Sequence, residues 1–431
     1  MDAIGIVLLL LGLFVIFRIL NIGYDGDLKS ILTLEPGSAE NVAKITVPAH
    51  PFLMVMSVLF VLSGAMSVLR LTGRTESIAP ERTFQRWMLA LLIVCGLLVI
   101  PGIMIAAVAG GRTNITTMFS ESLRLATPLA IGAMAGLWCE RAGVVNIAIE
   151  GMMLFAACMG FTMLFYMQRD YPDMDLNLAL FLGVVVAVLC GGLAALLHAW
   201  LSITFKTDQI VSGTVINILA VGVTSFVRRE YLLSTEAGTV TLPNVEIPLL
   251  ADIPIIGEPL FNNKPIFYLM FVIIIASHVI LFHTRWGLRT RSIGEHPHAA
   301  DTLGINVNRM RWINVFAAGL IAGLAGAWFS LEATGRFTDN MTRGSGFIAL
   351  ASLIFGKWTP FGAFTGALLF GFSDALGVRL QSEGGGFQAL DIDVPVQFLQ
   401  MVPYLVTIIV LAGLIGRAQG PKAVGKPYEK E

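Results

Sequence analysis

The chain has 431 residues, 56% of them hydrophobic and only 13% charged, and its mean hydropathy is +0.78. Soluble domains carry about a quarter charged residues, so this composition excludes a soluble globular protein and indicates one that is embedded in a bilayer. The net charge of −1 also excludes a general nucleic-acid-binding role.

Apolar segments recur along the whole chain at lengths that suit membrane-crossing helices, which need roughly 20 residues. The long segments lie near 4–20, 52–71, 88–108, 144–167, 178–203, 210–227, 266–282, 312–331 and 395–416. Shorter segments, broken by Gly or Pro, lie at 123–138, 346–356 and 361–376. Together they predict an all-α fold, a polytopic transmembrane helical bundle with broken or re-entrant helices.

The distribution of charge predicts that both termini face the cytoplasm. If Met1 is inside and each segment crosses once, the inner loops carry 14 Lys and Arg against 8 Asp and Glu, whereas the outer loops carry 10 against 18. An excess of Lys and Arg is typical of cytoplasmic loops. Because the basic tail 417–431 must also be inside, 346–376 is expected to enter and leave on the same side, with a helix break at residues 356–362.

The first polar constellation interrupts the apolar pattern between Glu140 and Glu150. We interpret Glu140 and Arg141 as a polar turn of mixed charge. Asn146 precedes Glu150 by four residues, so on a helix both would face one side. An ionisable residue inside an apolar run is costly unless it is partnered or hydrated. Three roles for Glu150 therefore stay open: a structural hydrogen bond, the lining of a translocation path, or a proton carrier in a self-contained secondary transporter.

Three further residues are candidates for the substrate path. Asn217 lies in an apolar segment, where it either forms a helix–helix hydrogen bond or lines the path. Phe347 and Trp358 offer aromatic faces on which a base or sugar could stack, although such residues also serve as packing.

Residues 289–312 form a polar, basic stretch, RTRSIGEHPHAADTLGINVNRMRW, between two apolar runs. We expect a loop that another protein holds. The sequence contains no catalytic triad, no metal cluster and no GxxxxGK[ST] loop for nucleotide phosphates. We therefore predict neither an enzyme nor a cofactor, and we expect that any energy is spent by another subunit.

The runs ERAGVVNI and EGMM at 140–153, the stretch from Arg291 to Ile305, and the segments 346–363 and 368–371 resemble permease subunits of bacterial ABC importers. The resemblance is to the branched-chain amino acid/ribose superfamily and its nucleoside and simple-sugar branch, and it covers roughly 120–416. It identifies the 289–312 stretch as similar to that family's cytoplasmic coupling loop, with the candidate residues Arg289, Arg291, Gly294, Glu295, Ala299, Ala300 and Gly304.

The resemblance implies a transport subunit for nucleosides or simple sugars in the bacterial plasma membrane. It implies as partners cytoplasmic ATPase subunits, a second permease subunit, an extracytoplasmic substrate-binding protein and membrane lipid, with no nucleic acid. The expected organisation is N-terminal transmembrane helices over 1–110, a permease core over 111–416 and a cytoplasmic basic tail over 417–431. The path candidates in that core are Asn146, Glu150, Asn217, Phe347 and Trp358.

Overall fold

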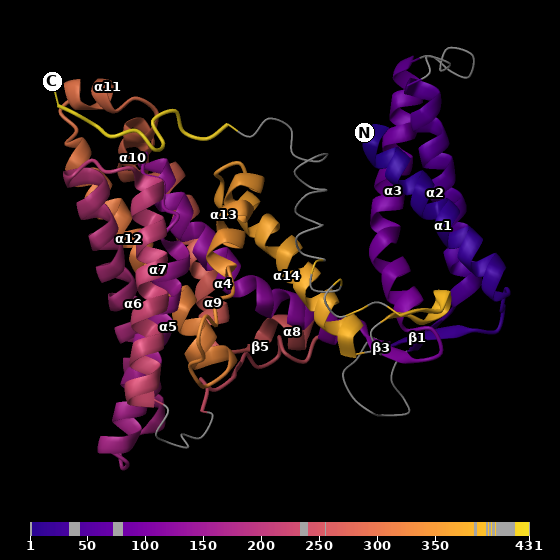
Figure 1. The fold of residues 1–431 in the computed structure, drawn as a ribbon, viewed down its shortest axis with the longest axis horizontal. Coiled ribbons are helices and arrows are strands. Elements are labelled where there is room, and N and C mark those ends of the chain that lie inside the picture. Colours follow the sequence, from indigo (N-terminus) through magenta and orange to yellow (C-terminus); the bar gives the residue numbers. More distant parts are fainter. Residues whose placement is uncertain are drawn as a thin grey trace. The chain divides into compact units, whose positions relative to one another are not determined.

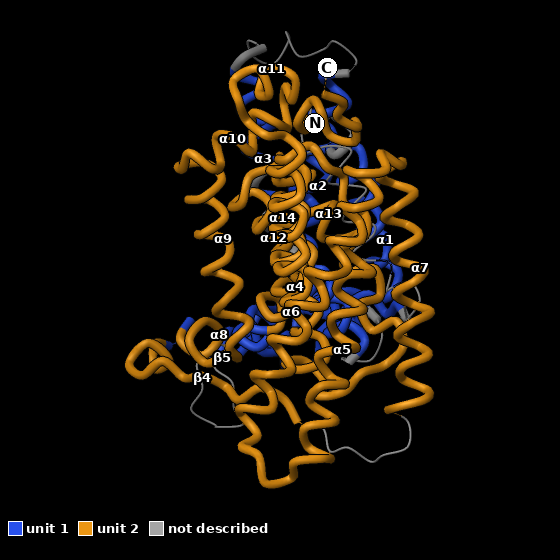
Figure 2. The backbone as a smooth tube through the Cα atoms, turned by 90° about the vertical axis from the view of Figure 1, so that its left-hand side faces the viewer, with its two compact units in different colours: residues 1–120, 254–256, 373–416 blue, residues 121–253, 257–372, 417–431 orange. Residues whose placement is uncertain are grey.

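The computed structural model describes residues 2–33, 44–71, 81–232, 240–254, 256–382, 386–393, 395, 398, 401 and 419–430. Contacts divide these residues into two compact units (Figures 1 and 2). Unit 1 contains residues 1–120, 254–256 and 373–416, and unit 2 contains 121–253, 257–372 and 417–431. Within the described part, ten helices are long and apolar enough to cross a membrane. The all-α transmembrane bundle predicted from hydropathy is thereby confirmed.

Unit 1 combines three long helices with a small sheet. The helices are α1 (Asp2–Ile22), α2 (Ala49–Leu71) and α3 (Glu81–Ala107), and the strands are β1 (Lys29–Thr33), β2 (Lys44–Pro48) and β3 (Arg112–Asn114). Strand β1 pairs antiparallel with β2 and parallel with β3. Helix α1 packs closely on α2, since a Cβ on Gly64 would lie 2.2 Å from the Cβ of Leu9.

A short segment far along the chain completes unit 1. It contains β6 (Gly386–Phe387), the 3₁₀ turn η5 (Gln388–Leu390) and β7 (Ile392–Asp393). Arg18 donates hydrogen bonds of 2.9 and 2.8 Å to the carbonyls of Leu390 and Asp391. His50 Nε2 contacts the Ala389 carbonyl at 2.8 Å, and because a carbonyl only accepts, this nitrogen carries the proton. The first helices of the chain are therefore fastened to this late segment.

Unit 2 holds most of the remaining helices, and α4 and α14 extend from it into unit 1. In chain order they are α4 (Ile115–Arg141), α5 (Ile149–Asp170), α6 (Leu176–Ala199), α7 (Gln209–Val227), α8 (Gly257–Phe261), α9 (Pro265–His283), α10 (Arg285–Glu295), α11 (Pro297–Thr302), α12 (Val307–Ala327), α13 (Ser345–Phe355) and α14 (Pro360–Ser382). Wide π-helical turns extend α6, α7 and α12, namely η2 (Trp200–Thr204), η3 (Arg228–Leu232) and η4 (Trp328–Ala333). Strands β4 (Val245–Glu246) and β5 (Asn262–Asn263) form a two-residue ladder.

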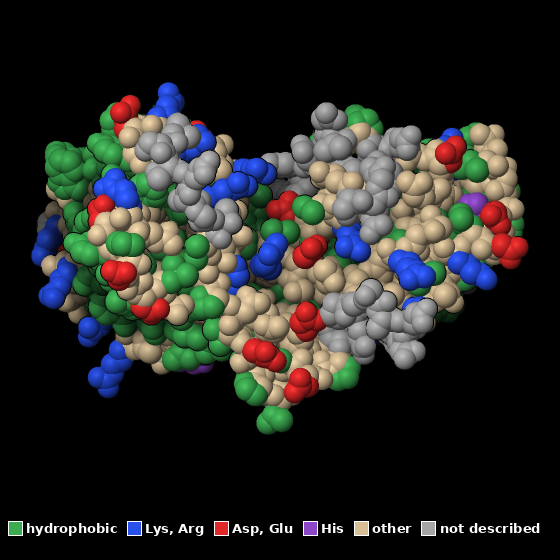
Figure 3. All heavy atoms as spheres, turned by 90° about the horizontal axis from the view of Figure 1, so that it is seen from below, with side chains coloured by type: hydrophobic (Ala, Val, Ile, Leu, Met, Phe, Trp, Pro, Cys, Tyr) green, Lys and Arg blue, Asp and Glu red, His purple; other side chains and the backbone are tan. Residues whose placement is uncertain are grey.

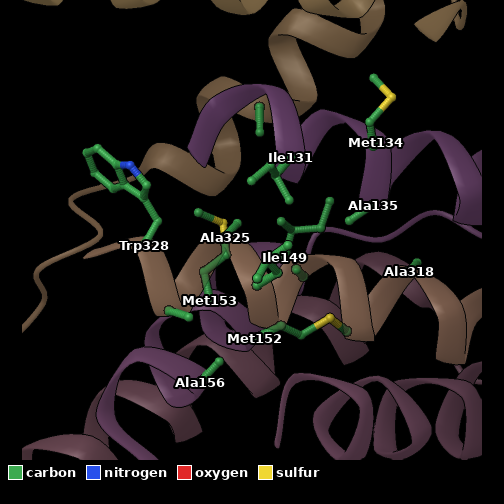
Figure 4. Close-up of a cluster of buried hydrophobic side chains, with 14 of the residues drawn as sticks. Ile131, Met134, Ala135, Ile149, Met152, Met153, Ala156, Ala318, Ala325 and Trp328 are labelled. Atoms are coloured by element: carbon green, nitrogen blue, oxygen red, sulfur yellow. The ribbon is translucent and has the colours of Figure 1, made fainter. Parts of the chain in front are cut away.

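The core of unit 2 lies where α4, α5 and α12 meet, and Ile131, Ile149, Met152, Met153 and Ala325 belong to its fully buried cluster (Figure 4).

Helices α6 and α12 approach each other through glycines. A Cβ on Gly191 of α6 would lie 2.5 Å from the carbonyl oxygen of Gly319 on α12, so only glycine permits this approach. The Gly319 and Gly323 pattern, four residues apart, thus provides close helix packing of the kind common in membranes.

The flank of the helices is apolar, as expected for a surface in contact with lipid. Ile218 on α7 is 68% exposed and Leu193 on α6 is 60% exposed. At the lower end of the molecule, which Figure 3 shows, acidic and basic side chains stand among the hydrophobic ones. Exposed large apolar side chains along crossing helices need no protein partner when lipid surrounds them.

Three predicted boundaries were wrong. The predicted short segment 123–138 is the interior of α4, which runs from Ile115 to Arg141 with Pro128 inside it. The segment predicted from residue 144 becomes helical only at Ile149. The segment 361–376 belongs to α14, which is 23 residues long and can cross a membrane, so only α13 is a short half-helix. The predicted helix at 395–416 lies almost wholly outside the described residues.

Candidate functional site

The stretch 289–312 is an elbow of two helices, where the sequence analysis expected a loop. Thr284 is the N-cap of helix α10 (Arg285–Glu295), and its side chain accepts a hydrogen bond from the Gly287 amide at 3.2 Å. Pro297 then starts α11 (Pro297–Thr302), and α12 already begins at Val307. We call α10 and α11 together the α10–α11 elbow.

The elbow's predicted residues separate into an inner and an outer face. Gly294 and Ala300 are buried, Arg291 and Glu295 are partly buried, and Arg289, Ala299 and Gly304 are exposed. The inner residues contact the rest of unit 2, and the outer ones are free to meet something else.

A hollow opens on the outer side of the elbow. It is lined by Trp286, Arg289, Leu303, Gly304, Ile305, Asn306, Arg309, Met310 and Ile313. Leu303 is 82% exposed and stands beside two arginines, so the hollow offers both an apolar contact and positive charge. This combination suits a protein surface that carries an apolar anchor and acidic groups.

Gly294 brings the elbow against the end of α4. A Cβ on Gly294 would lie 2.2 Å from the Arg141 carbonyl oxygen, so any larger residue would push the two helices apart. The ring of Phe282 contacts two guanidinium groups, with its centroid 5.3 Å from Cζ of Arg141 and 5.1 Å from Cζ of Arg291. Two cation–π contacts with one ring strengthen the same junction.

The end of α4 also holds the break between α13 and α14. The indole Nε1 of Trp358 donates to the Glu140 carboxylate, and Arg141 donates to the Trp358 carbonyl from Nε at 3.0 Å and Nη2 at 2.5 Å. Lys357 and Trp358 both have left-handed backbone, with φ of 51° and 52°, so this turn is strained and needs such support. Glu140 and Arg141 are therefore the last residues of a helix and not a separate polar turn.

The connection between α4 and α5 is held by two neighbouring helices. The Val145 amide donates to Gln209 Oε1 at 2.7 Å, and the Val145 carbonyl accepts from His198 Nε2 at 2.9 Å. His198 Nδ1, at 3.1 Å, then accepts from the Ser212 hydroxyl. Since Asn217 Oδ1 accepts from the Gly151 amide at 2.7 Å and its Nδ2 donates to the Ile147 carbonyl at 3.0 Å, the non-helical turn keeps its backbone groups satisfied.

Asn146 and Glu150 do not share a helix face, because Asn146 lies in the turn before α5 begins. Asn146 is fully buried and its amide contacts the sulfur atoms of Cys139 and Met152 at 3.3 and 3.7 Å. The prediction that the two residues face the same side failed because it assumed a continuous helix from residue 144.

Glu150 caps the short helix α13. Its Oε1 accepts from the Thr342 hydroxyl at 2.6 Å and the Gly344 amide at 2.8 Å, and its Oε2 accepts from the Gly346 amide at 2.6 Å. An anionic side chain suits this position, because free amides and the helix dipole both favour negative charge at a helix start. The carboxylate thereby joins α5 to the start of α13 through three hydrogen bonds.

The remaining path candidates, Phe347 and Trp358, lie in different surroundings. Phe347 is 49% exposed on α13, whereas Trp358 is 8% exposed and is held by Glu140 and Arg141. The structure thus places Trp358 against Glu140 and Arg141, and Gly294 abuts the same Arg141. Sequence reasoning missed Gln209, His198 as a hydrogen-bonding residue, and Arg311, which is only 2% exposed. Only His198 stands in an apolar run, since Gln209 follows the polar residues Thr207 and Asp208, and Arg311 belongs to the polar stretch 289–312.

Comparison with known proteins agrees with this architecture. The model of the family described as branched-chain amino acid transport system / permease component matches residues 118–411. The guanosine ABC transporter permease protein NupQ of Bacillus subtilis is 42% identical over 317 residues, which cover 72% of this chain and 95% of that protein. The nucleoside ABC transporter permease protein NupC of Lactococcus lactis is 38% identical over 316 residues, covering 72% and 96%.

A putative glucose ABC transporter permease protein, TsgC13 of Haloferax volcanii, is 32% identical over 337 residues, which cover 73% of this chain and 98% of that protein. No solved structure matches the chain significantly. The matched region begins after the first three helices and includes the elbow. It also includes the turn between α4 and α5 and the turn between α13 and α14, which we call the two helix breaks. The chain therefore belongs to the family of branched-chain amino acid transport system permease components.

Proposed function

We propose that the chain is the permease subunit of an ABC importer of nucleosides in the bacterial plasma membrane. Two of its relatives are named as guanosine and nucleoside permeases at 42% and 38% identity, and a glucose permease follows at 32%. This order supports nucleosides first and simple sugars second. ATP is hydrolysed by separate cytoplasmic subunits, and a second permease and an extracytoplasmic binding protein complete the assembly.

The observation that carries the coupling role is the chain of contacts from the elbow to the helix breaks. Gly294 abuts Arg141, and Arg141 with Glu140 holds Trp358. An ATPase subunit that docks in the hollow beside Arg289 and Leu303 pushes the elbow. Because Gly294 leaves no space at the end of α4, a displacement of the elbow also displaces Arg141. Through Arg141 it reaches the turn between α13 and α14.

In this proposal the elbow and both termini face the cytoplasm, which the excess of Lys and Arg in the predicted inner loops supports. The path runs along α13, where the exposed ring of Phe347 is available to a base or a sugar face. Asn146, Glu150 and Asn217 hold the backbone that borders it, and Trp358 stands at its inner end.

The rival proposal, a self-contained transporter that carries protons on Glu150, has less support. The relatives are named as ABC transporter permeases. The carboxylate also accepts three hydrogen bonds that hold α13 in place, so protonation would release the start of that helix.

Uptake of labelled guanosine into proteoliposomes tests the proposal. The vesicles hold this chain, the second permease, the ATPase and the binding protein, with unlabelled glucose as a competitor in a parallel arm. We expect uptake to require ATP and every component, and to fail with Gly294→Trp or Glu295→Ala. Gly222→Trp is the matched control, because a Cβ at Gly222 meets no atom within 4 Å.

Uptake by this chain alone, driven by a proton gradient and indifferent to ATP, would refute the importer. Competition by glucose in place of nucleosides would move the substrate to the sugar class while leaving the coupling role intact.

A further inference from the structure

Residues 419–430, which we call the C-terminal strap, lie across the inner face of the α10–α11 elbow. The Ala423 amide donates to the Gly294 carbonyl at 2.9 Å, and the Lys422 amide donates to the Glu295 carboxylate at 3.3 Å. Gly294, which the strap holds, is also the residue at which α10 abuts the end of α4. A basic tail that only floated in solvent would make no such backbone bonds.

The strap also provides a hydrogen-bond acceptor for a buried cation. Arg311 on α12 is 2% exposed, and its guanidinium donates to the Lys426 carbonyl at 3.1 Å. Its Nε and its other terminal nitrogen have no hydrogen-bond partner among the described residues. Without the strap, this buried cation would lose a hydrogen-bond acceptor, at a cost in free energy. This cost favours the bound position of the strap.

Tyr428 anchors the strap in an apolar cluster. The side chain is 5% exposed, and its ring centroid lies 5.2 Å from that of His298 on α11. The cluster consists of Ala142, Ile293, Ala300, Val307, Met310 and Tyr428, with Trp286 and Ile305 packed against it. Three of these residues, Trp286, Ile305 and Met310, also line the outer hollow. Tyr428 therefore supports the hollow from behind without entering it.

Two further contacts extend the strap to both helix breaks. A Cβ on Gly420 would lie 2.9 Å from the indole ring of Trp358, at the turn between α13 and α14. Gly425, with φ of +79°, stands beside Val145 in the turn between α4 and α5. The ion pair of Lys206 with Glu429, at 2.7 Å, is exposed and contributes little to this attachment. One segment thus touches the elbow and both breaks.

We propose that the C-terminal strap positions the α10–α11 elbow, so that a push on the hollow moves both helix breaks together, and that Tyr428 is its central positioning residue. This inference rests on the proposed function, since it assigns a role in passing energy from an ATPase to the path. Without the strap the elbow still offers its hollow to a partner, but the hollow has lost its support and the push is dissipated in local movement.

The test compares Tyr428→Ala, Tyr428→Phe and Glu429→Ala in the reconstituted complex, with guanosine uptake and ATP hydrolysis measured on the same vesicles. We expect Tyr428→Ala to assemble and to hydrolyse ATP, while the guanosine carried per ATP falls about fivefold or more, the lower range of coupling between sites. Tyr428→Phe keeps the ring and is expected to restore the ratio. Glu429→Ala removes only an exposed ion pair and is expected to leave the ratio unchanged.

Gly425→Ala provides a second variant, since it strains the left-handed turn of the strap without touching the apolar cluster. We expect it to lower the same ratio. An unchanged ratio in both Tyr428→Ala and Gly425→Ala would overturn the inference while the importer stands. Failure of the unaltered chain to transport with the ATPase would instead refute the proposed function, so the two failures are distinguishable.

Discussion

Arg141, the last residue of α4, holds the backbone carbonyl of Trp358 with two hydrogen bonds from one guanidinium, at 3.0 and 2.5 Å. The two residues are 217 positions apart in the sequence. This bond pair joins the helix that abuts the elbow to the strained turn that follows α13. It therefore connects the turn between α4 and α5 with the turn between α13 and α14.

Arg141→Lys is expected to weaken this junction, because an ammonium cannot reproduce the two-pronged geometry. We expect the free energy of unfolding to fall by about 1–2 kcal/mol, and uptake per ATP to fall with it. Thermal unfolding of the purified protein in detergent measures the first effect. Arg169→Lys, in an exposed pair with Asp170, is the control, and an equal loss there would contradict the special role of Arg141.

Glu150→Gln is expected to lower stability without abolishing ATP-driven uptake. An amide has one acceptor oxygen, so at least one of the three donors at the start of α13 loses its partner, at a cost of about 1–3 kcal/mol. Uptake measured with and without an uncoupler checks the functional half of the prediction. The exposed Glu258→Gln serves for comparison. Complete loss of uptake in a correctly assembled Glu150→Gln complex would revive the proton-carrier alternative.

Asn217→Leu is expected to release the turn between α4 and α5. The substitution leaves the Gly151 amide and the Ile147 carbonyl without their partner, which costs about 1–3 kcal/mol for each buried group left unsatisfied. Hydrogen exchange at residues 142–151 should accelerate in this variant. Thr214→Val, on the exposed side of the same helix, should leave exchange there unchanged, and equal acceleration in both would speak against a local clamp.

Gly191→Ala is expected to separate α6 from α12, because its new methyl would lie 2.5 Å from the Gly319 carbonyl oxygen. We expect a loss of about 1–3 kcal/mol in the free energy of unfolding. Gly222→Ala meets no neighbour and should raise stability by up to about 1 kcal/mol through better helix propensity. Unfolding measured side by side decides this prediction, which fails if the two variants change in the same direction.

The sequence was sufficient for the helices but not for all their ends. Hydropathy located α6, α7 and α9 closely, because a crossing helix must be apolar over its length. It missed the first part of α4, where Thr116, Glu121 and Ser122 lower the local hydropathy. Polar side chains do not interrupt the backbone hydrogen bonds of a helix, so α4 begins earlier than its apolar run.

The contacts of the candidate site lay beyond sequence reasoning for a different reason. The pattern singled out Gly294, Glu295 and Trp358 separately, but nothing in it could pair Trp358 with Glu140 and Arg141. The strap contacts join distant positions such as Ala423 and Gly294 through single hydrogen bonds between backbone groups. Backbone groups are the same in every residue, so such pairings leave no trace in composition or spacing.

The shortness of α13 has a consequence for how the chain sits in lipid. Eleven helical residues rise about 16 Å, roughly half of the hydrocarbon thickness of a bilayer. The approach to it, residues 334–344, is not helical and leaves its peptide groups to other partners. Such backbone is stable at membrane depth only against protein or water. The helical half therefore satisfies its own backbone, whereas the stretch before it depends on partners from elsewhere in the chain, and the carboxylate of Glu150, which accepts from the Gly344 amide, is one of them.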